Sequence, residues 1–243
     1  MDLDLAGKKA LVTGGSRGVG RGIVLSLARA GVDVVTCYRQ ESELVESLVR
    51  ELKEIGGDHH VVPADVCSEA DVDRLVEECR VHYGRLDVVV NNAGAISHIP
   101  FEKLSLDEWH RIVDTDLTAT FLVTQKALPL LAPGGSVVNV GSKVATVGIP
   151  LRAHYTAAKA GLVGLTRSLA KEYGSKGLRF NIVAPGPVQT ETETPEPVKE
   201  RYRTMIPLGR LGTTEDIANV VLFLASPRAA FVTGETINVD GGL

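Results

Sequence analysis

The stretch Thr13-Gly-Gly-Ser-Arg-Gly-Val-Gly20 follows a short apolar run at residues 9–12 and precedes an amphipathic run that starts at residue 18. Gly14, Gly18 and Gly20 allow the backbone to turn sharply, to approach a bound group closely and to pack a helix against a strand. The free N–H groups at the start of that helix favour an anion such as a diphosphate. The stretch therefore predicts the first strand–turn–helix unit of a nucleotide-binding α/β fold.

Apolar and amphipathic runs alternate along the rest of the chain. We expect strands at 9–12, 32–37, 60–62, 86–90, 136–140, 179–183 and 236–239, and helices at 18–30, 41–55, 69–82, 105–131, 152–173 and 214–225. Runs that are apolar throughout suit strands buried on both faces of a parallel sheet. The predicted fold class is α/β: one domain over residues 1–243, with a Rossmann-type, doubly wound, mainly parallel seven-stranded sheet and helices on both faces. A (β/α)8 barrel is the structural alternative, which the glycine turn disfavours.

Composition limits the class of protein. The 243 residues carry a net charge of -4, with 44% apolar and 23% charged residues, so a basic footprint for nucleic acid is absent. No apolar run reaches the ~18 residues of a membrane-spanning helix, and the chain starts without a signal-peptide core. The three cysteines form no C-x-x-C pair and the six histidines show no metal-ligand spacing. We expect a cytoplasmic domain with no metal, no nucleic-acid partner and no membrane contact.

The end of the second predicted strand indicates which nucleotide binds. An NAD site usually has an acidic residue there for the ribose hydroxyls. Here Tyr38 and Arg39 end the strand, and no carboxylate follows until Glu41. Arg39, together with Arg17 in the glycine loop, could hold a 2′-phosphate through charge-assisted hydrogen bonds. The pair favours NADPH/NADP+ as the cofactor.

Three polar residues in the second half of the chain form a catalytic pattern. Tyr155 and Lys159 are four residues apart, so a helix would place the phenol and the ammonium on one face. Ser142 lies thirteen residues before Tyr155, directly after a predicted strand. The stretch Asn91-Asn-Ala-Gly94 follows the fourth predicted strand.

Taken in order, these motifs resemble the short-chain dehydrogenase/reductase family over essentially the whole chain, in particular its 3-oxoacyl-carrier-protein reductase branch. The resemblance implies that Tyr155 donates a proton to a carbonyl oxygen as hydride arrives from the nicotinamide. It implies that Ser142 hydrogen-bonds the same oxygen and that Lys159 binds the nicotinamide ribose and assists Tyr155. It also implies a homotetramer, since the segment 234–242 resembles an oligomer interface of the family.

The resemblance implies further cofactor contacts on both sides of the pocket. The adenine would meet Asp65 and Val66, and the nicotinamide end would be shaped by the residues after the sixth strand. Besides Gly14, Arg17, Gly18, Gly20, Arg39, Tyr155 and Lys159, the full expected set contains Ser16, Val19, Tyr38, Asp65, Val66, Asn92, Ala93, Gly94, Pro185, Gly186, Val188 and Thr190.

One position departs from the family pattern. The family usually has an asparagine in the helix after the fourth strand, where it organises a water chain to the lysine; here the residue is Asp116. Our hypothesis is that Asp116 preserves the relay and partly offsets the charge of Lys159, which makes Tyr155 harder to deprotonate. The alternative is a helix residue that bonds only to backbone.

The expected substrate pocket is mostly apolar. Its residues by neighbourhood to the motifs are Ser142, Val144, Ile149, Tyr155, Thr192 and Met205. They suit a small-molecule hydrophobic ketone. The segment 128–135 has no basic residue for an acidic carrier protein, so the main hypothesis is an NADPH-dependent ketoreductase of a free polycyclic (angucycline-type) ketone in polyketide biosynthesis.

Three alternatives remain open. The first is a 3-oxoacyl-carrier-protein reductase, the second a non-catalytic NADP-binding sensor, and the third a protein that is chiefly an assembly partner. The acidic stretch 189–197 is either a solvated loop or part of a substrate lid, which we place near 187–208.

Overall fold

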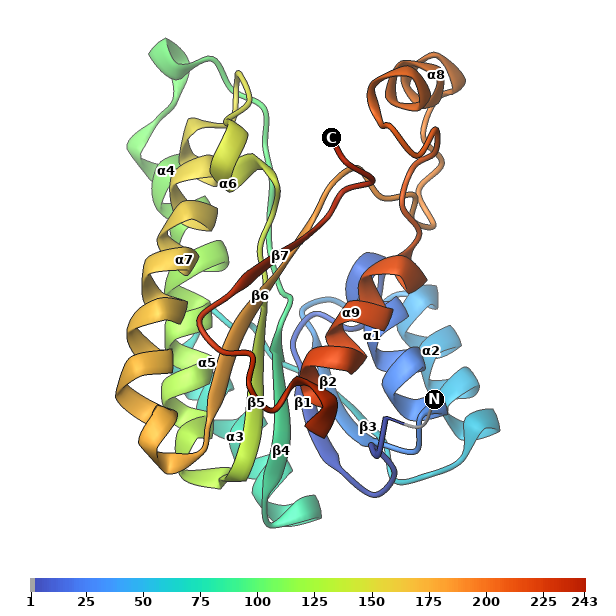
Figure 1. Ribbon diagram of the computed structural model, residues 1–243, viewed down its shortest axis with the longest axis vertical. Coiled ribbons are helices and arrows are strands. Elements are labelled where there is room, and N and C mark those ends of the chain that lie inside the picture. The colour runs from blue at the N-terminus through green and yellow to red at the C-terminus, as the bar shows by residue number, and fades with distance from the viewer. Residues whose placement is uncertain (1–2) are drawn as a thin grey trace.

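The computed structural model describes residues 3–243, and its centre is one parallel sheet (Figure 1). The strand order is β3-β2-β1-β4-β5-β6-β7, and every pair of neighbours is parallel. The strands are β1 (Lys9–Val12), β2 (Asp33–Tyr38), β3 (His60–Pro63), β4 (Leu86–Asn91), β5 (Leu131–Val140), β6 (Arg179–Pro185) and β7 (Thr236–Val239). The predicted Rossmann-type doubly wound fold is confirmed, and the barrel alternative is excluded because β3 and β7 are open edges.

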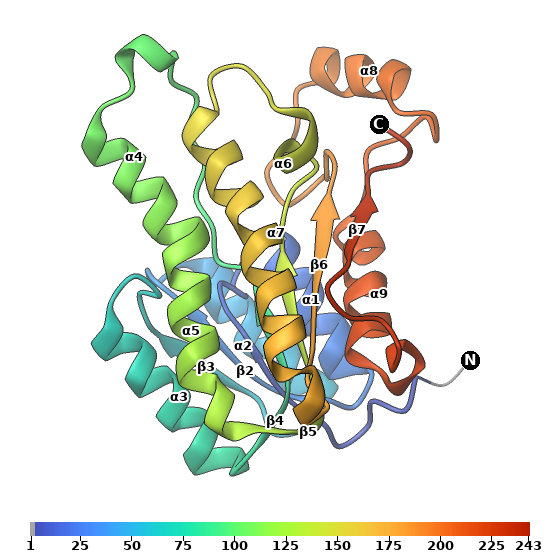
Figure 2. The ribbon, with the colours of Figure 1, turned by 60° about the vertical axis from the view of Figure 1, so that its left-hand side comes forward.

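Helices cover both faces of this sheet (Figures 1 and 2). One face carries α1 (Gly18–Arg29), α2 (Glu43–Ile55) and α9 (Thr214–Ala225). The opposite face carries α3 (Glu69–Tyr83), α4 (Leu106–Val113), α5 (Ala119–Ala127) and α7 (Ala153–Tyr173). Shorter helices lie above the carboxyl edge: α6 (Val144–Val147) and α8 (Glu196–Met205). Single 3-10 turns occupy Phe101–Lys103, Leu128–Leu130, Gly174–Lys176 and Pro227–Ala229.

Successive strand residues explain the two layers. Leu11 and Val89 pack in the core cluster under α3 and α5, whereas their chain neighbours Val12 and Val90 pack in the cluster under α1 and α9. Side chains alternate between the faces of a strand, so a strand that is apolar at every position fills two cores at once. The uninterrupted apolar runs in the sequence are the direct cause of this doubly covered sheet.

The predicted helix at 105–131 is interrupted in the structure. Between α4 and α5, residues Asp114–Thr118 form a π-helical turn, in which the Ala119 N–H donates to the Asp114 carbonyl five residues earlier. The amphipathic pattern does not distinguish a π turn from a regular α-helix. Such turns are rare and often occur at functional sites, and this one carries Asp116.

A buried chain of amides joins the centre of the sheet to the helices on one face. Asn91 Nδ2 donates to Asn139 Oδ1 at 2.8 Å and to Thr124 Oγ1 at 2.9 Å, and Asn139 Nδ2 donates to Thr166 Oγ1 at 2.9 Å. A buried amide N–H without an acceptor would be costly at this depth, so these three hydrogen bonds help to fix how β4 and β5 align with α5 and α7. It thereby positions the carboxyl ends of both strands.

Residues 3–243 lack two features that would indicate particular partners. None of the helices there is long and apolar enough to cross a membrane. Within the same residues, no group of three or more His, Cys, Asp or Glu side chains is arranged to hold a metal ion.

Candidate active site

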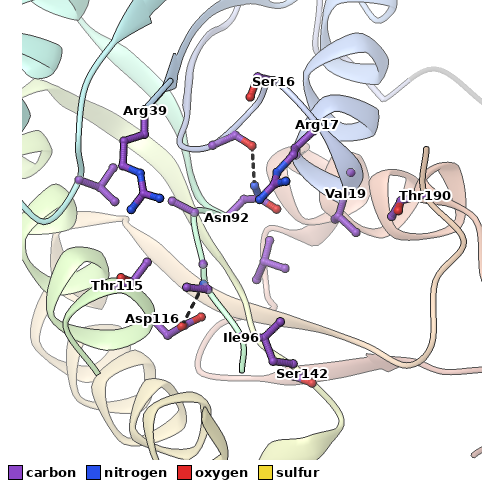
Figure 3. Close-up of a pocket in the computed structure, with 18 of the residues that line it drawn as sticks. Ser16, Arg17, Val19, Arg39, Asn92, Ile96, Thr115, Asp116, Ser142 and Thr190 are labelled. Atoms are coloured by element: carbon purple, nitrogen blue, oxygen red, sulfur yellow. Dashed lines mark hydrogen bonds between the residues drawn. The ribbon is translucent and has the colours of Figure 1, made fainter. Parts of the chain in front are cut away.

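A pocket of about 780 Å³ opens at the carboxyl edge of the sheet (Figure 3). Parallel sheets of this topology bind ligands at that edge, where the strand order reverses between β1 and β4. The pocket brings together all the expected cofactor residues and all four expected catalytic residues. Its lining includes Gly14, Ser16, Arg17, Gly18, Val19, Gly20, Tyr38, Arg39, Asp65, Val66, Asn92, Ala93, Gly94, Asp116, Ser142, Tyr155, Lys159, Pro185, Gly186, Val188 and Thr190.

The glycine loop is braced by the end of β4. Asn92 Nδ2 donates to the carbonyls of Thr13 and Gly14, both at 3.0 Å, and the dashed line in Figure 3 marks one of these contacts. In return, Thr13 Oγ1 accepts from the backbone N–H groups of Asn92 and Ala93 at 3.0 and 3.1 Å. The Asn92 side chain therefore stabilises the conformation of the glycine loop. The resemblance implies a direct contact with the cofactor, whereas these hydrogen bonds are to the backbone of the loop.

We expect Gly20→Ala to disrupt this loop. A Cβ at position 20 would lie 2.2 Å from the Gly14 oxygen and 2.3 Å from Asn92 Nδ2, which is closer than any real contact allows. Relief of the clash must move the loop, so the free energy of unfolding should fall by about 1–3 kcal/mol and NADPH binding should weaken more than tenfold. Urea unfolding and fluorescence titration with NADPH measure the two effects.

Gly164→Ala is the matched control for this prediction. Gly164 lies in α7, and a Cβ there would meet no atom within 4 Å. Alanine favours a helix interior more than glycine, so this variant should be slightly stabilised and should bind NADPH normally. A Gly20→Ala protein that behaved like Gly164→Ala would contradict the proposed close approach.

Two arginines lie on the adenosine side of the pocket without partners. Arg17 and Arg39 are exposed, and neither guanidinium makes a hydrogen bond or ion pair within residues 3–243. In Figure 3 both side chains extend toward the middle of the pocket. Glu41, the first carboxylate after β2, accepts a hydrogen bond from the Tyr38 hydroxyl, and this bond raises the pKa of Tyr38. Within residues 3–243 no carboxylate pairs with either guanidinium, so both arginines stay available to a bound phosphate.

The three expected catalytic side chains come from two neighbouring elements. Ser142 follows β5 directly, and Tyr155 and Lys159 lie one turn apart near the start of α7. Lys159 Nζ is 5.6 Å from the centre of the Tyr155 ring and donates to the Val140 carbonyl at 3.0 Å. The ammonium is thus held next to the phenol, as the four-residue spacing predicts.

Asp116 forms a buried ion pair with this lysine. Asp116 Oδ1 is 3.0 Å from Lys159 Nζ, and the two side chains are 0% and 5% exposed. Its other oxygen, Oδ2, accepts from the Ala95 N–H at 3.1 Å. The alternative that Asp116 bonds only to backbone is therefore wrong. The carboxylate contacts both Lys159 and the loop after β4, while its effect on Tyr155 stays a prediction.

The expected substrate residues divide into two groups. Ser142, Tyr155 and Thr192 line the pocket, whereas Val144, Ile149 and Met205 do not. Val144 is buried at the start of α6, where its N–H donates to Ser142 Oγ at 3.3 Å. Ile149 and Met205 are 41% and 48% exposed; Ile149 lies just beyond the end of α6, and Met205 is the last residue of α8. Sequence neighbourhood to a motif does not determine which way a loop side chain points.

The pocket has further lining residues that the sequence did not single out as site residues. Arg111 and Thr115 lie one turn apart on the helix that leads to Asp116. Thr115 directly precedes Asp116, and Arg111 is four residues before Thr115, so helical spacing from Asp116 could have indicated both. Glu191 is the third, and it comes from the segment 187–208. Ile96, by contrast, is an expected pocket residue from its place two residues after the stretch 91–94; it lines the pocket and is 47% exposed.

Arg111 is oriented by a network beside the pocket. Glu108 accepts two hydrogen bonds of 2.7 Å from the Arg111 guanidinium and one of 2.5 Å from the Ser97 hydroxyl. Ser97 Oγ is also 2.7 Å from Nε2 of His154, a fully buried residue next to Tyr155. The network joins the loop after β4, helix α4 and the start of α7.

This network gives a prediction about pH. The hydrogen bonds from Arg111 and then Ser97 lower the pKa of Glu108 from the usual 4.5 to about 2. A carboxylate with a lowered folded-state pKa stabilises the fold above its unfolded-state value, and this contribution is lost as the pH falls through the folded value. The stability difference between wild type and Glu108→Gln should be full above about pH 5 and disappear toward pH 2.

The check is urea unfolding of both proteins between pH 2 and 7. The control is Glu54→Gln, since Glu54 is exposed and makes no ion pair with any residue that the structure describes. Its difference from wild type should stay near zero across the range. A Glu108→Gln difference that did not vary with pH would contradict the prediction.

Comparison with known proteins agrees with this geometry. The model of the family described as "Enoyl-(Acyl carrier protein) reductase" matches residues 14–243. The 3-oxoacyl-(acyl-carrier-protein) reductase FabG of Staphylococcus aureus strain Mu50 is 42% identical over 240 residues, which cover 97% of this chain and 98% of that protein. The 3-oxoacyl-(acyl-carrier-protein) reductase of Synechocystis sp. is 39% identical over 245 residues and 98% of both chains.

Solved structures agree as well. A short-chain dehydrogenase/reductase from Serratia marcescens superposes with a TM-score of 0.93, 34% identity and 98% coverage of both chains. A blue fluorescent protein from a metagenomic library, in complex with NADPH, gives a TM-score of 0.92 and 37% identity, again over 98% of both chains.

A doubly wound sheet whose pocket joins a glycine loop to a serine, a tyrosine and a lysine defines a nicotinamide-dependent oxidoreductase. The chain belongs to the short-chain dehydrogenase/reductase family. It is an NADP-dependent enzyme of the carbonyl-reducing kind, as the sequence predicted.

Proposed function

We propose that this protein is an NADPH-dependent reductase of 3-oxoacyl thioesters, the first of the three alternatives that the sequence left open. The observation that carries the proposal is that Ser142, Tyr155 and Lys159 line the same pocket as the glycine loop. The names of the curated relatives, which match almost the whole chain, favour this substrate over a free polycyclic ketone.

The part of the pocket around the glycine loop suits a dinucleotide. The N–H of Gly18 opens α1 at the pocket, and no Cβ at Gly20 blocks the approach to the loop. Two unpartnered guanidinium groups, from Arg17 and Arg39, face the end where a 2′-phosphate would lie. When bound, the reduced nicotinamide supplies the hydride; the protein's own groups handle the proton and the orientation.

In the proposed reaction, the ketone oxygen lies within reach of both Ser142 and Tyr155. Ser142 donates a hydrogen bond that polarises the carbonyl, and Tyr155 donates the proton that completes the alcohol. Lys159 stabilises the phenolate that is left behind, because its ammonium lies on the same helix face. Asp116 holds Lys159 in place, so that it can pass a proton back to the phenol through water.

A second substrate class has an observation in its favour. The segment 128–135, at the start of β5, has no basic side chain that could attract an acidic carrier protein. Ile96, an exposed apolar side chain, lines the pocket. An apolar lining residue would suit the free polycyclic ketone of polyketide biosynthesis that the sequence suggested.

The deciding experiment compares initial rates of NADPH oxidation with two substrates. One is a 3-oxoacyl thioester on an acyl-carrier protein, and the other is a free polycyclic aromatic ketone. We expect a higher kcat/KM for the carrier-bound thioester. A higher value for the free ketone would establish the second class instead, and no turnover of either would favour the NADP-binding sensor. The homotetramer and the cytoplasmic location stay predictions.

The cofactor preference has its own test. We expect Arg39→Ala to weaken NADPH binding about 10–100-fold, because charge-assisted hydrogen bonds to the 2′-phosphate are lost. NADH lacks that phosphate, so its Kd should change less than about twofold. The control is Arg29→Ala, an exposed arginine in the last turn of α1, far along the helix from the pocket. An equal loss of affinity for NADPH and NADH in Arg39→Ala would show that Arg39 does not bind the 2′-phosphate.

A further inference from the structure

The segment 187–208 is fixed at both ends and nearly free between them. Gln189 N–H donates to the Gly212 carbonyl at 2.9 Å, and at the other end Ile206 is buried. Between these points α8 buries no residue. Its ion pairs, from Lys199 and Arg203 to glutamates, all stay inside the segment.

A single polar contact ties the middle of this segment to the body of the protein. The Gly18 N–H donates to Glu191 Oε2 at 2.9 Å. Within residues 3–243, no other hydrogen bond or ion pair joins residues 190–205 to a residue outside 187–208. Thr190 lies over the same glycine: its methyl carbon would be 3.7 Å from a Cβ at position 18.

The Gly18 N–H that binds Glu191 lies where the cofactor diphosphate would bind. Gly18 is the first residue of α1, and its N–H is one of the free donors that would face the cofactor diphosphate. A carboxylate at a helix N-terminus is stabilised by the same donors and the same dipole that stabilise a phosphate. Both anions cannot occupy one N–H group, and they repel each other at that distance.

We propose that Glu191 occupies, in the cofactor-free protein, the position of a cofactor phosphate, and that the cofactor must displace it to bind. This inference rests on the proposed function only in assuming that a dinucleotide binds at the glycine loop. Glu191 then has two effects: it holds the segment 187–208 against the pocket, and it lowers the affinity for the cofactor. Displacement by the diphosphate releases the one tether of α8.

The first readout is cofactor affinity. Glu191→Gln and Glu191→Ala should lower the Kd of NADPH about three- to tenfold, since the competing anion is gone. The diphosphate is common to both nucleotides, so the Kd of NADH should fall by the same factor. Titrations followed by nucleotide fluorescence give both values.

The second readout needs no cofactor. α8 contains trypsin sites, and the Arg201 guanidinium makes no ion pair within the described residues. In cofactor-free protein, cleavage after Arg201 should be several-fold faster in Glu191→Ala than in wild type, because the tether is lost. Glu191→Gln keeps an amide oxygen that can accept from the Gly18 N–H without the charge, so its cleavage rate should lie between those of wild type and Glu191→Ala. Mass spectrometry of the early products measures this rate.

Glu193→Gln is the matched control. This substitution removes one negative charge from the same segment, as Glu191→Gln does. The Glu193 side chain is 87% exposed, however, and its ion pair with Lys199 lies inside the segment. It should leave the Kd of both nucleotides and the rate of cleavage after Arg201 as in wild type.

Tighter binding of both nucleotides together with faster cleavage, in the Glu191 variants alone, supports the proposal. A Glu191→Ala protein that matches Glu193→Gln in either readout overturns it, as does an effect on NADPH without NADH. If wild type bound no nucleotide, the proposed function would fail, and the cleavage rate would still decide whether Glu191 tethers the segment.

Discussion

Tyr155→Phe should lower kcat for ketone reduction by about 10²–10⁴-fold, because the variant has no group to protonate the carbonyl oxygen. The Tyr155 hydroxyl makes no hydrogen bond with any residue that the structure describes, so its removal should leave the fold intact. The unfolding midpoint should match that of wild type, and the Kd of NADPH should change far less than kcat, since Tyr155 is one of many expected cofactor contacts. Steady-state rates on the better substrate, together with nucleotide titration, measure these quantities.

Ser142→Ala is the companion to this variant. Its hydroxyl would donate one hydrogen bond to the same oxygen but would transfer no proton, so the loss should be smaller or equal, about 10²-fold. A Tyr155→Phe enzyme that retained most of its rate would remove the tyrosine from the mechanism. A loss that came with failed NADPH binding would instead mean that the variant disturbs the pocket.

Asp116→Ala should have the largest effect on stability. The substitution leaves Lys159 buried without its carboxylate, and breaking a buried pair from one side costs about 3 kcal/mol or more. It also leaves the Ala95 N–H without its acceptor. The free energy of unfolding should fall by about that amount, and kcat should fall with it because Lys159 is no longer held. Urea unfolding and steady-state rates are the measurements.

Asp116→Asn separates charge from hydrogen bonding. The amide oxygen can still accept from Lys159 or from the Ala95 N–H, so this variant should lose much less stability than Asp116→Ala. With the carboxylate gone, the charge of Lys159 acts undiminished on the phenol and favours its deprotonation. The fall in reduction rate at high pH should therefore move to lower pH. An unchanged pH–rate profile would show that Asp116 does not act on Tyr155 through its charge.

The fold could be predicted in detail because the signals for it are local. An apolar run such as 9–12 indicates a buried strand, and the predicted strands 9–12 and 236–239 both have the observed ends. The glycine loop, the positions of Arg17 and Arg39, and the Tyr155–Lys159 spacing all follow from short stretches of chain. Local geometry determines each of them, so neighbouring residues carry enough information.

The contacts between distant segments could not be predicted in this way. The π turn that carries Asp116 has the same amphipathic pattern as a plain helix, and its ion pair joins residues 43 positions apart along the chain. The orientation of Val144, Ile149 and Met205 depends on how α6 and α8 sit above the sheet, which no periodicity encodes.

The sequence by itself determined the α/β class and predicted the candidate cofactor residues and the trio Ser142, Tyr155 and Lys159 that one pocket brings together, since propensity, turn chemistry and spacing act over a few residues. Only the tertiary structure decided that Asp116 pairs with Lys159, that Asn92 braces the glycine loop and that Glu191 binds the Gly18 N–H. Each of these contacts depends on chain packing that brings remote groups within 3 Å or so, and a hydrogen bond or ion pair exists only at such distances.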